Sequence, residues 1–482
     1  MNLRLRTARG VRISLAATIA NTVAQAVIMA VLGRLLRPAE YGLAAAALVV
    51  VKPAQQLLLL GLEQSTVLQT DLSPRAIPSL FWVSLCAELA GCVAIVAALL
   101  LLPGIPAGYR DITIALSFLL PASAIAIAPL AQMRRDLAFG KISIAEFLSV
   151  VVGFGGVGIA AALMGCGAFS LAYGYLAQAF LRSAIACALA SGFPPRWDFA
   201  ISEIRPILSF GARITKVTVL ENVHFQVLPA FIAFYFGWAA LGQFNQGLML
   251  ITLPLILIAT AMTRVIATNF RLARGDRSQL EEVCRALVED AGALTLPICF
   301  GMAAAAAPLV KIVLGSQWGE AAALMPWLCL GAACNCLAML FAVMNEAVGR
   351  LEEKFAIQGI ATVVLIALLF LAGRGSLERC AQMYSVSALF YLALQVGLSR
   401  RVLQVRVTAM AHWMLPGALC SVLVVGFILG ARAVLPHIPA AAQAGLDIAG
   451  AAAILWAFYA LLYPRLLRHI FELVGLGRTA PA

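Results

Sequence analysis

The sequence predicts an all-α polytopic membrane protein, and three observations support that fold class. Of the 482 residues, 63% are hydrophobic and only 12% are charged, whereas roughly a quarter of a soluble chain is charged. The mean hydropathy is +0.97. Apolar runs of about 20 residues, the length of a helix that crosses the hydrocarbon core, recur along the whole chain. A bilayer is therefore the solvent that suits this composition.

About fourteen of these runs are predicted to be membrane-spanning helices. Arginines precede the first run, but it extends to about Leu36, which is too long for the apolar core of a signal peptide. The predicted spans are 12–36, 41–68, 78–102, 111–131, 142–164, 168–190, 206–236, 239–269, 286–306, 321–347, 354–372, 377–399, 412–434 and 442–464.

The segments that connect the spans carry an uneven charge. An even number of spans puts both termini on one side, and 22 of the 34 Lys and Arg residues fall on that side against seven on the other. The positive-inside rule therefore places both termini in the cytoplasm. The rule also explains the net charge of +12 without a nucleic-acid partner. The longest cytoplasmic connections, 191–205 and 270–285, are too short to fold as separate domains.

Several patterns that carry chemistry in soluble proteins have a structural interpretation here. The eleven cysteines lie mostly in apolar runs without a CxxC pair, which indicates free thiols. Gly153, Gly155 and Gly158 match GxGxxG inside a predicted span, where small residues bring helices close together. No GxxxxGK[ST] or HExxH motif is present. We therefore expect no cofactor and no metal. Without a P-loop for ATP hydrolysis, any energetically unfavourable step would need an ion gradient, the membrane potential or consumption of the product.

Charged residues inside the predicted spans point to function, because a charge at the bilayer centre costs about 2.5–3.5 kcal/mol on insertion scales. Such residues usually face a water-filled cavity or pair with one another. They include the basic residues Lys52, Arg182, Arg213, Lys216 and Arg264 and the acidic residues Glu63, Glu88 and Glu221.

Helical spacing, at about 100° per residue, gathers these charges with other polar residues on single faces. The polar face of the second span comprises Lys52, Gln55, Gln56 and Glu63. That of the seventh span comprises Arg213, Lys216, Glu221 and His224, and that of the first span Ser14, Thr18, Asn21 and Gln25. Three such faces are typical of the walls of a hydrated cavity.

Other interpretations of these charges stay open. Glu63 and Arg182 lie where their side chains could snorkel to the interface. Arg213 and Lys216, in the first turns of their span, could be positive-inside anchors. Glu88 is deep and isolated, and pairing is its default role.

Three segments resemble conserved turns of the polysaccharide-unit flippases. LLRPAEYG at 35–42 resembles the "LLxPxxYG" turn between spans one and two, and FGWAALGQFN at 236–245 resembles the "GxxxLGxY" join between spans seven and eight. LGSQWGEAA at 314–322 resembles the "LGxxWxxAA" outer loop. These flippases share a superfamily with the multidrug MATE exporters and the lipid II flippase. One departure is Asn222-Val223-His224, where relatives often have an aspartate in place of His224.

The resemblance implies an alternating-access transporter with two six-helix lobes, 1–200 and 201–405, around a central cavity. An extra helix pair with a cytoplasmic tail follows at 406–482. The implied cargo is an undecaprenyl-diphosphate oligosaccharide, moved from the cytoplasmic to the periplasmic leaflet of a bacterial inner membrane for exopolysaccharide, capsule or O-antigen synthesis. The implied partners are membrane lipids, a polysaccharide polymerase and a chain-length regulator.

This cargo assigns roles to the polar residues. Cations in a low-dielectric cavity bind a diphosphate strongly, and the candidates are Lys52, Arg213, Lys216 and Arg264. The candidates for sugar contacts are Asn21, Gln25, Gln55, Gln56, Gln243 and Asn245. The candidates for ion or proton coupling are Glu63, Glu221 and His224.

Three other functions remain as alternatives. A MATE-type antiporter of drugs or cations would prefer an acidic cavity, but the in-span residues comprise five bases and three acids. A membrane-embedded glycan polymerase or ligase would need a large outer loop or a catalytic cluster, and the sequence has neither. A scaffold without transport would have no use for polar faces on several spans. We therefore expect a flippase, not an enzyme.

Overall fold

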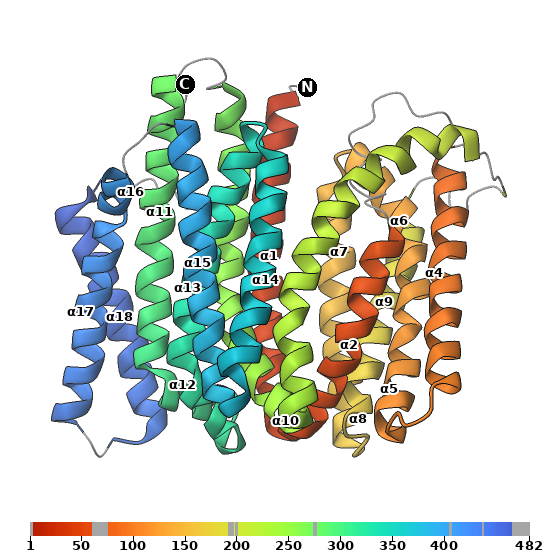
Figure 1. The fold of residues 1–482 in the computed structure, drawn as a ribbon, viewed down its shortest axis with the longest axis horizontal. Coiled ribbons are helices and arrows are strands. Elements are labelled where there is room, and N and C mark those ends of the chain that lie inside the picture. The colour runs from red at the N-terminus through yellow and green to blue at the C-terminus, as the bar shows by residue number, and fades with distance from the viewer. Residues whose placement is uncertain are drawn as a thin grey trace. The chain divides into compact units, whose positions relative to one another are not determined.

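The computed structural model describes residues 3–59, 76–190, 197, 201–272, 277–403, 407–435 and 438–464. This described part is built from helices (Figure 1), as the sequence predicts. It divides into two compact units, Met1–Gly242 and Gln243–Ala482, called unit 1 and unit 2 below.

The described residues of unit 1 form nine helical elements and the first part of a tenth. They are α1 (Leu3–Leu35), α2 (Pro38–Leu59), α4 (Ala76–Leu101), α5 (Ala107–Ser117), α6 (Leu119–Arg135), α7 (Phe139–Leu148), the π-helical stretch η1 (Ser149–Val157), α8 (Gly158–Leu163), α9 (Phe169–Leu189) and α10 (Ile201–Leu272). Gly237 interrupts α10 with φ 80° and ψ −176°, a conformation open to glycine because it has no Cβ.

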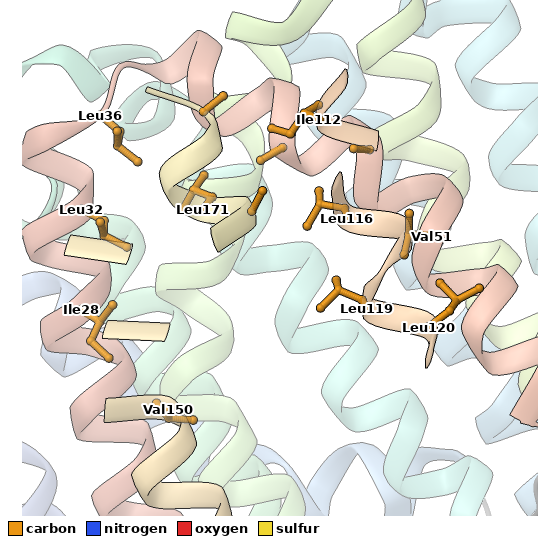
Figure 2. Close-up of a cluster of buried hydrophobic side chains, with 14 of the residues drawn as sticks. Ile28, Leu32, Leu36, Val51, Ile112, Leu116, Leu119, Leu120, Val150 and Leu171 are labelled. Carbon is orange, nitrogen blue, oxygen red and sulfur yellow. The ribbon is translucent and has the colours of Figure 1, made fainter. Parts of the chain in front are cut away.

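The main buried cluster of unit 1 is apolar. Figure 2 shows Ile28, Leu32 and Leu36 in a row on one face of α1. The same cluster takes in Val51 of α2 and Leu116 of α5, all buried. Since lipid is as apolar as these side chains, close packing rather than exclusion of water holds such helices together.

Unit 2 continues from the second part of α10. Its other elements are α11 (Arg277–Ala304), α12 (Ala306–Val313), η2 (Ser316–Trp318), α13 (Gly319–Ala347), α14 (Leu351–Ala372), η3 (Gly373–Gly375), α15 (Leu377–Leu403), α16 (Val407–Trp413), α17 (Leu415–Val434) and α18 (Ala440–Leu462). Figure 1 shows α17 and α18 side by side at the end of the chain, and the two helices pack against each other.

Each predicted span coincides with helix wherever the structure describes it; of 41–68, residues 60–68 lie outside the described part. In the described ranges, twelve stretches are long and apolar enough to cross a membrane. The number is below fourteen because Val219–Thr260 counts as one stretch although two spans were predicted there. Helix α9 lies where 168–190 was predicted but is not among the twelve. The protein is a multi-pass membrane protein, and the count of fourteen stays a prediction.

The glycines at the GxGxxG match are helix-packing positions, as predicted. A Cβ on Gly153 would lie 2.7 Å from the backbone of Gln178 in α9, and one on Gly174 would lie 3.0 Å from the carbonyl of Phe154. These glycines therefore let η1 and α9 pack with their backbones in contact.

A second close crossing joins α2 to α10. A Cβ on Gly42 would overlap the carbonyl of Trp238, and a Cβ on Gly242 would overlap the carbonyl of Pro38. Trp238 also stacks on Tyr109 with ring centroids 5.3 Å apart. Two of the segments that resemble flippase turns, 35–42 and 236–245, thus form one packing contact inside unit 1.

A buried amide network connects α13 to α15 in unit 2. Asn345 Nδ2 donates to Gln395 Oε1 at 3.1 Å, and Ser399 Oγ donates to Asn345 Oδ1 at 2.9 Å. Gln395 Nε2 donates in turn to the hydroxyl of Tyr391 at 3.2 Å. All four side chains are buried. Because no water reaches these groups, each depends on the others for its hydrogen bonds.

The last two helices are attached to α11. A Cβ on Gly417 of α17 would overlap the carbonyl of Gly292. The hydroxyl of Tyr459 in α18 donates to the carbonyl of Ala293 at 2.9 Å. Arg432 and Asp447 form an ion pair of 3.1 Å between α17 and α18, and Asp447 is buried. The helix pair is therefore an integral part of unit 2.

We predict that Gly42→Ala destabilises the folded protein by about 1–3 kcal/mol, because the added methyl overpacks a backbone contact. The measurement is the melting temperature of the detergent-solubilised protein. Gly426→Ala is the matched control, because a Cβ there meets open space. Equal melting temperatures for the two variants would contradict the crossing.

We also predict that Asn345→Ala costs about 1–3 kcal/mol for each buried partner left without a hydrogen bond. Thr252→Ala is the control, since the Thr252 hydroxyl is exposed and bonds only within its own helix. Denaturant unfolding compares the two variants. A loss at Asn345 no larger than that at Thr252 would show that the network contributes little to stability.

Candidate functional site

Polar side chains join α2 to the first part of α10 in unit 1. Asn222 Nδ2 donates a hydrogen bond to Gln56 Oε1. Gln56 belongs to the polar face predicted for the second span, whereas Asn222 lies outside the face predicted for the seventh span, about 180° from Arg213 at 100° per residue. Glu221 is half-buried beside it. His224 is buried, with its ring edge-to-face against Phe225 at 5.7 Å.

Lys52 is the accessible cation of α2. It precedes Pro53 at mid-helix, its side chain is exposed, and its charge acts on that of Arg182 in α9. Helices α2 and α9 pack against each other. Two basic groups from different helices are thus brought to one region of unit 1.

One carboxylate faces this pair of bases. Arg182 Nη2 lies 3.7 Å from Glu146 Oε1 of α7, with the side chains 35% and 39% exposed. The Nε of Arg182 is buried without a hydrogen-bond partner in the described part of the chain. The group formed by Lys52, Arg182 and Glu146, called the basic cluster below, therefore has one more positive than negative charge and a spare N–H donor.

Sequence reasoning left Arg182 as a snorkelling residue, and the structure places it with Lys52. No pattern along the chain could have shown this, because the two residues are on separate helices and meet only through the packing of α9 on α2. Glu146, at the end of α7, was not singled out at all. A carboxylate within a predicted span was the signal that could have identified it.

The predicted polar residues of α1 are also in unit 1. Asn21 and Gln25 are half-buried, and Asn21 Oδ1 is buried without a partner among the described residues. Gln55 is only 8% exposed, whereas its neighbour Gln56 is exposed. Adjacent residues on a helix point in different directions, so one of the two glutamines packs inside while the other stays accessible.

Four predicted site residues have side chains outside the described part of the structure. Arg213, Lys216 and Arg264 belong to α10, whose backbone is described at these positions. Glu63 lies outside the described residues altogether.

Gln243 in unit 2 has a structural role. Its Nε2 donates to the carbonyl of Gln317 at 2.9 Å, and its Oε1 accepts from the backbone N–H of Ala321 at 2.9 Å. These bonds attach α10 to the turn before α13, where Trp318 is fully buried. The second and third flippase-like segments are therefore bonded to each other. Asn245, two residues later, is half-buried.

This arrangement suits a bound anion. Charge-assisted hydrogen bonds from Lys and Arg to phosphate are short and strong where water is sparse.

Among the described residues, no group of three His, Cys, Asp or Glu side chains is placed to hold a metal ion. All eleven cysteines are free.

Curated proteins from three bacteria are similar to this chain. The chain is 22% identical over 380 residues to the lipopolysaccharide biosynthesis protein WzxC of Escherichia coli (strain K12), which covers 78% of this chain and 76% of the relative. It is 25% identical over 297 residues to the succinoglycan biosynthesis transport protein ExoT of Rhizobium meliloti (strain 1021), covering 60% and 59%. It is also 22% identical to the teichuronic acid biosynthesis protein TuaB of Bacillus subtilis (strain 168), covering 69% and 70%.

Solved structures share the fold. The lipid II flippase MurJ in an inward closed conformation matches with a TM-score of 0.74 and 13% identity, over 94% of this chain and 99% of that one. An inward-facing MATE multidrug transporter matches with a TM-score of 0.60 and 16% identity, over 83% and 98%. These matches show that the chain shares the fold of the two transporters.

The family model described as "Polysaccharide biosynthesis protein" matches residues 31–323. The match contains all three flippase-like segments and the basic cluster. It also covers more than half of the chain, and on this evidence the chain belongs to the polysaccharide biosynthesis protein family.

Proposed function

We propose that this protein flips a lipid-linked oligosaccharide from the cytoplasmic to the periplasmic leaflet of the bacterial inner membrane, for the synthesis of a surface polysaccharide. The observation that carries the proposal is the basic cluster of Lys52, Arg182 and Glu146, whose excess positive charge suits the diphosphate of an undecaprenyl-diphosphate cargo. The curated relatives are named for three different glycans. Those names support a glycan cargo without selecting its sugars.

The diphosphate contacts follow from charge and access. Lys52 is exposed, and Arg182 is bound on one side only, so both can donate to phosphate oxygens. Glu146 pairs with Arg182 and offsets one of the two positive charges without neutralising both. Arg213, Lys216 and Arg264 extend the proposed set of cations along α10.

The residues that we propose to contact the sugars are fewer than those predicted from the sequence alone. Asn21, Gln25, Gln56 and Asn245 carry amides that are half-buried or exposed, and amides suit sugar hydroxyls because they both donate and accept hydrogen bonds. We leave out Gln55, which is buried, and Gln243, whose amide is bonded to backbone.

The remaining parts of the proposal concern topology and coupling. Both termini lie in the cytoplasm, and lobes 1–200 and 201–405 alternate access with the pair at 406–482 attached. Glu63, Glu221 and His224 are candidates for ion or proton coupling. A polymerase and a chain-length regulator receive the flipped product. The protein itself makes no covalent change in the glycan.

The rival is a MATE-type antiporter, because the MATE structures share the fold. An organic cation would be repelled by a cluster with a net positive charge, which favours the anionic cargo.

Deletion of the gene tests the function directly. We expect loss of surface polysaccharide, with intact lipid-linked oligosaccharide trapped on the cytoplasmic leaflet, where it is protected from an externally added glycosidase. Unchanged surface glycan together with raised sensitivity to cationic drugs would contradict a flippase and favour the antiporter.

Substitutions in the basic cluster test the site. Lys52→Ala and Arg182→Gln each remove a charge-assisted hydrogen bond, so we expect export to fall about tenfold or more at equal protein level. Lys311→Ala is the matched control, because it removes a cation outside the cluster, and it should export normally. Full export by both cluster variants would leave the function intact but show that the cargo binds elsewhere.

A further inference from the structure

Glu88 is a carboxyl group enclosed in the middle of α4. Its exposed fraction is 0%, and both of its carboxyl oxygens lack a hydrogen-bond partner in the described part of the chain. Ionisable side chains are almost never fully buried unless they are paired. The pairing role expected for Glu88 from the sequence is therefore absent within the residues that the structure describes.

The surroundings of Glu88 are closely packed and contain small polar groups. Ser84 and Cys92 lie one turn before and one turn after it on the same face of α4, and both are buried. Cys92 Sγ is 3.3 Å from Ser117 Oγ at the end of α5. At the same level, a Cβ on Gly91 would contact Leu120 of α6 at 3.2 Å and would overlap Leu58 of α2.

The helices that face this part of α4 contain a break. Helix α5 ends at Ser117 and α6 begins at Leu119. Pro121 has no N–H, so the carbonyl of Ser117 receives no helical hydrogen bond from it. Cys92, one turn after Glu88, meets Ser117 at this break, so the carboxyl lies about one turn from the point where the opposing helix is interrupted.

Among the described residues, α2, α5 and α6 pack against α4, and none of them supplies a counter-ion to Glu88. Their charged and titratable groups, with those of α4 itself, are Glu40, Tyr41, Lys52, Cys86, Cys92, Tyr109, Arg110, Asp111, Arg134 and Arg135. Arg110 bonds to Asp111, Lys52 interacts with Arg182, and Glu40 accepts from the N–H of Arg37. Among the described residues, none of these groups forms an ion pair or hydrogen bond with Glu88.

We propose that Glu88 is a proton-binding site of unit 1, which is occupied by a proton in this packing and emptied only when α4 separates from the α5–α6 break. An ionised carboxylate without a partner in such a place costs several kcal/mol. Once water enters, the carboxylate is solvated and the proton passes to water, so no other reactant is needed. Protonation and the packing of α4 are then linked, and each favours the other.

The proton site is a property of unit 1 and does not depend on the cargo. Its use in transport rests on the proposed flippase function. If both hold, proton uptake and release at Glu88 would bias unit 1 between two packings during each transport cycle.

Infrared spectroscopy of the purified protein in nanodiscs tests the site. We expect the carbonyl band of a protonated carboxylic acid in the wild type at about pH 7, where an unperturbed Glu is ionised. That band should be missing from Glu88→Gln. Glu353→Gln, which removes an exposed carboxylate paired with Arg350, should leave it unchanged. Identical spectra for wild type and Glu88→Gln in this region would overturn the proposal.

Two uncharged variants distinguish the effect of the proton from the effect of side-chain volume on packing. Glu88→Gln and Glu88→Met keep the volume and remain uncharged, so both should fold with a melting temperature at or above that of the wild type. Glu88→Gln should slow glycan export at least tenfold at equal protein level, because unit 1 is held in the protonated packing. Normal export by Glu88→Gln would overturn the coupling role.

The outcomes distinguish this site from the proposed function. If deletion of the gene leaves surface glycan unchanged while the infrared band is present, the flippase proposal fails and the proton site stands. If deletion abolishes export but the band is absent, the flippase stands and the proton site fails.

Discussion

The constraint on which this structure depends is that a bilayer offers no hydrogen-bond partners. Each backbone group must be satisfied within its own helix, and polar side chains must find partners in neighbouring helices. Unit 2 shows the usual solution: Asn345, Gln395 and Ser399 bond one another between α13 and α15. In unit 1, two exceptions to this rule are the features that we connect with transport. The basic cluster keeps an unneutralised charge, and Glu88 lacks a partner in the described part.

Close contact between helix backbones is the second requirement of this fold, because the exclusion of water does not drive helix association in lipid. Glycines allow such contact at three helix crossings: α2 with α10, η1 with α9, and α11 with α17. The flippase-like segments contribute here. Gly42 and Gly242 let two of these segments meet, and Gln243 bonds the second to the third. The resemblance at these turns therefore reflects how helices are joined, while the cargo is decided by side chains elsewhere.

The two functional features of unit 1 have opposite character. The cluster around Lys52 is accessible and basic, which suits a large anionic cargo. The carboxyl of Glu88 is enclosed and isolated, which suits a proton and nothing larger. Helix α2 packs against both α9 and α4, so it contacts the helices that carry each feature. A rearrangement of α4 that released the proton would therefore also change the packing of α2, the helix that carries Lys52.

Sequence by itself determined the all-helical membrane fold, the position of the helices and the family, because apolar length and turn motifs are local properties. It also selected Lys52 and the Gln56 face of α2, since helical spacing sets which residues share a face. Tertiary structure alone decided the rest. Arg182 is brought to Lys52 only by the packing of α9 on α2. The side-chain amide of Gln243 is hydrogen-bonded to the backbone of a turn more than seventy residues away. Among the described residues, the helices packed against α4 bring no partner to Glu88, which spacing along one helix cannot reveal.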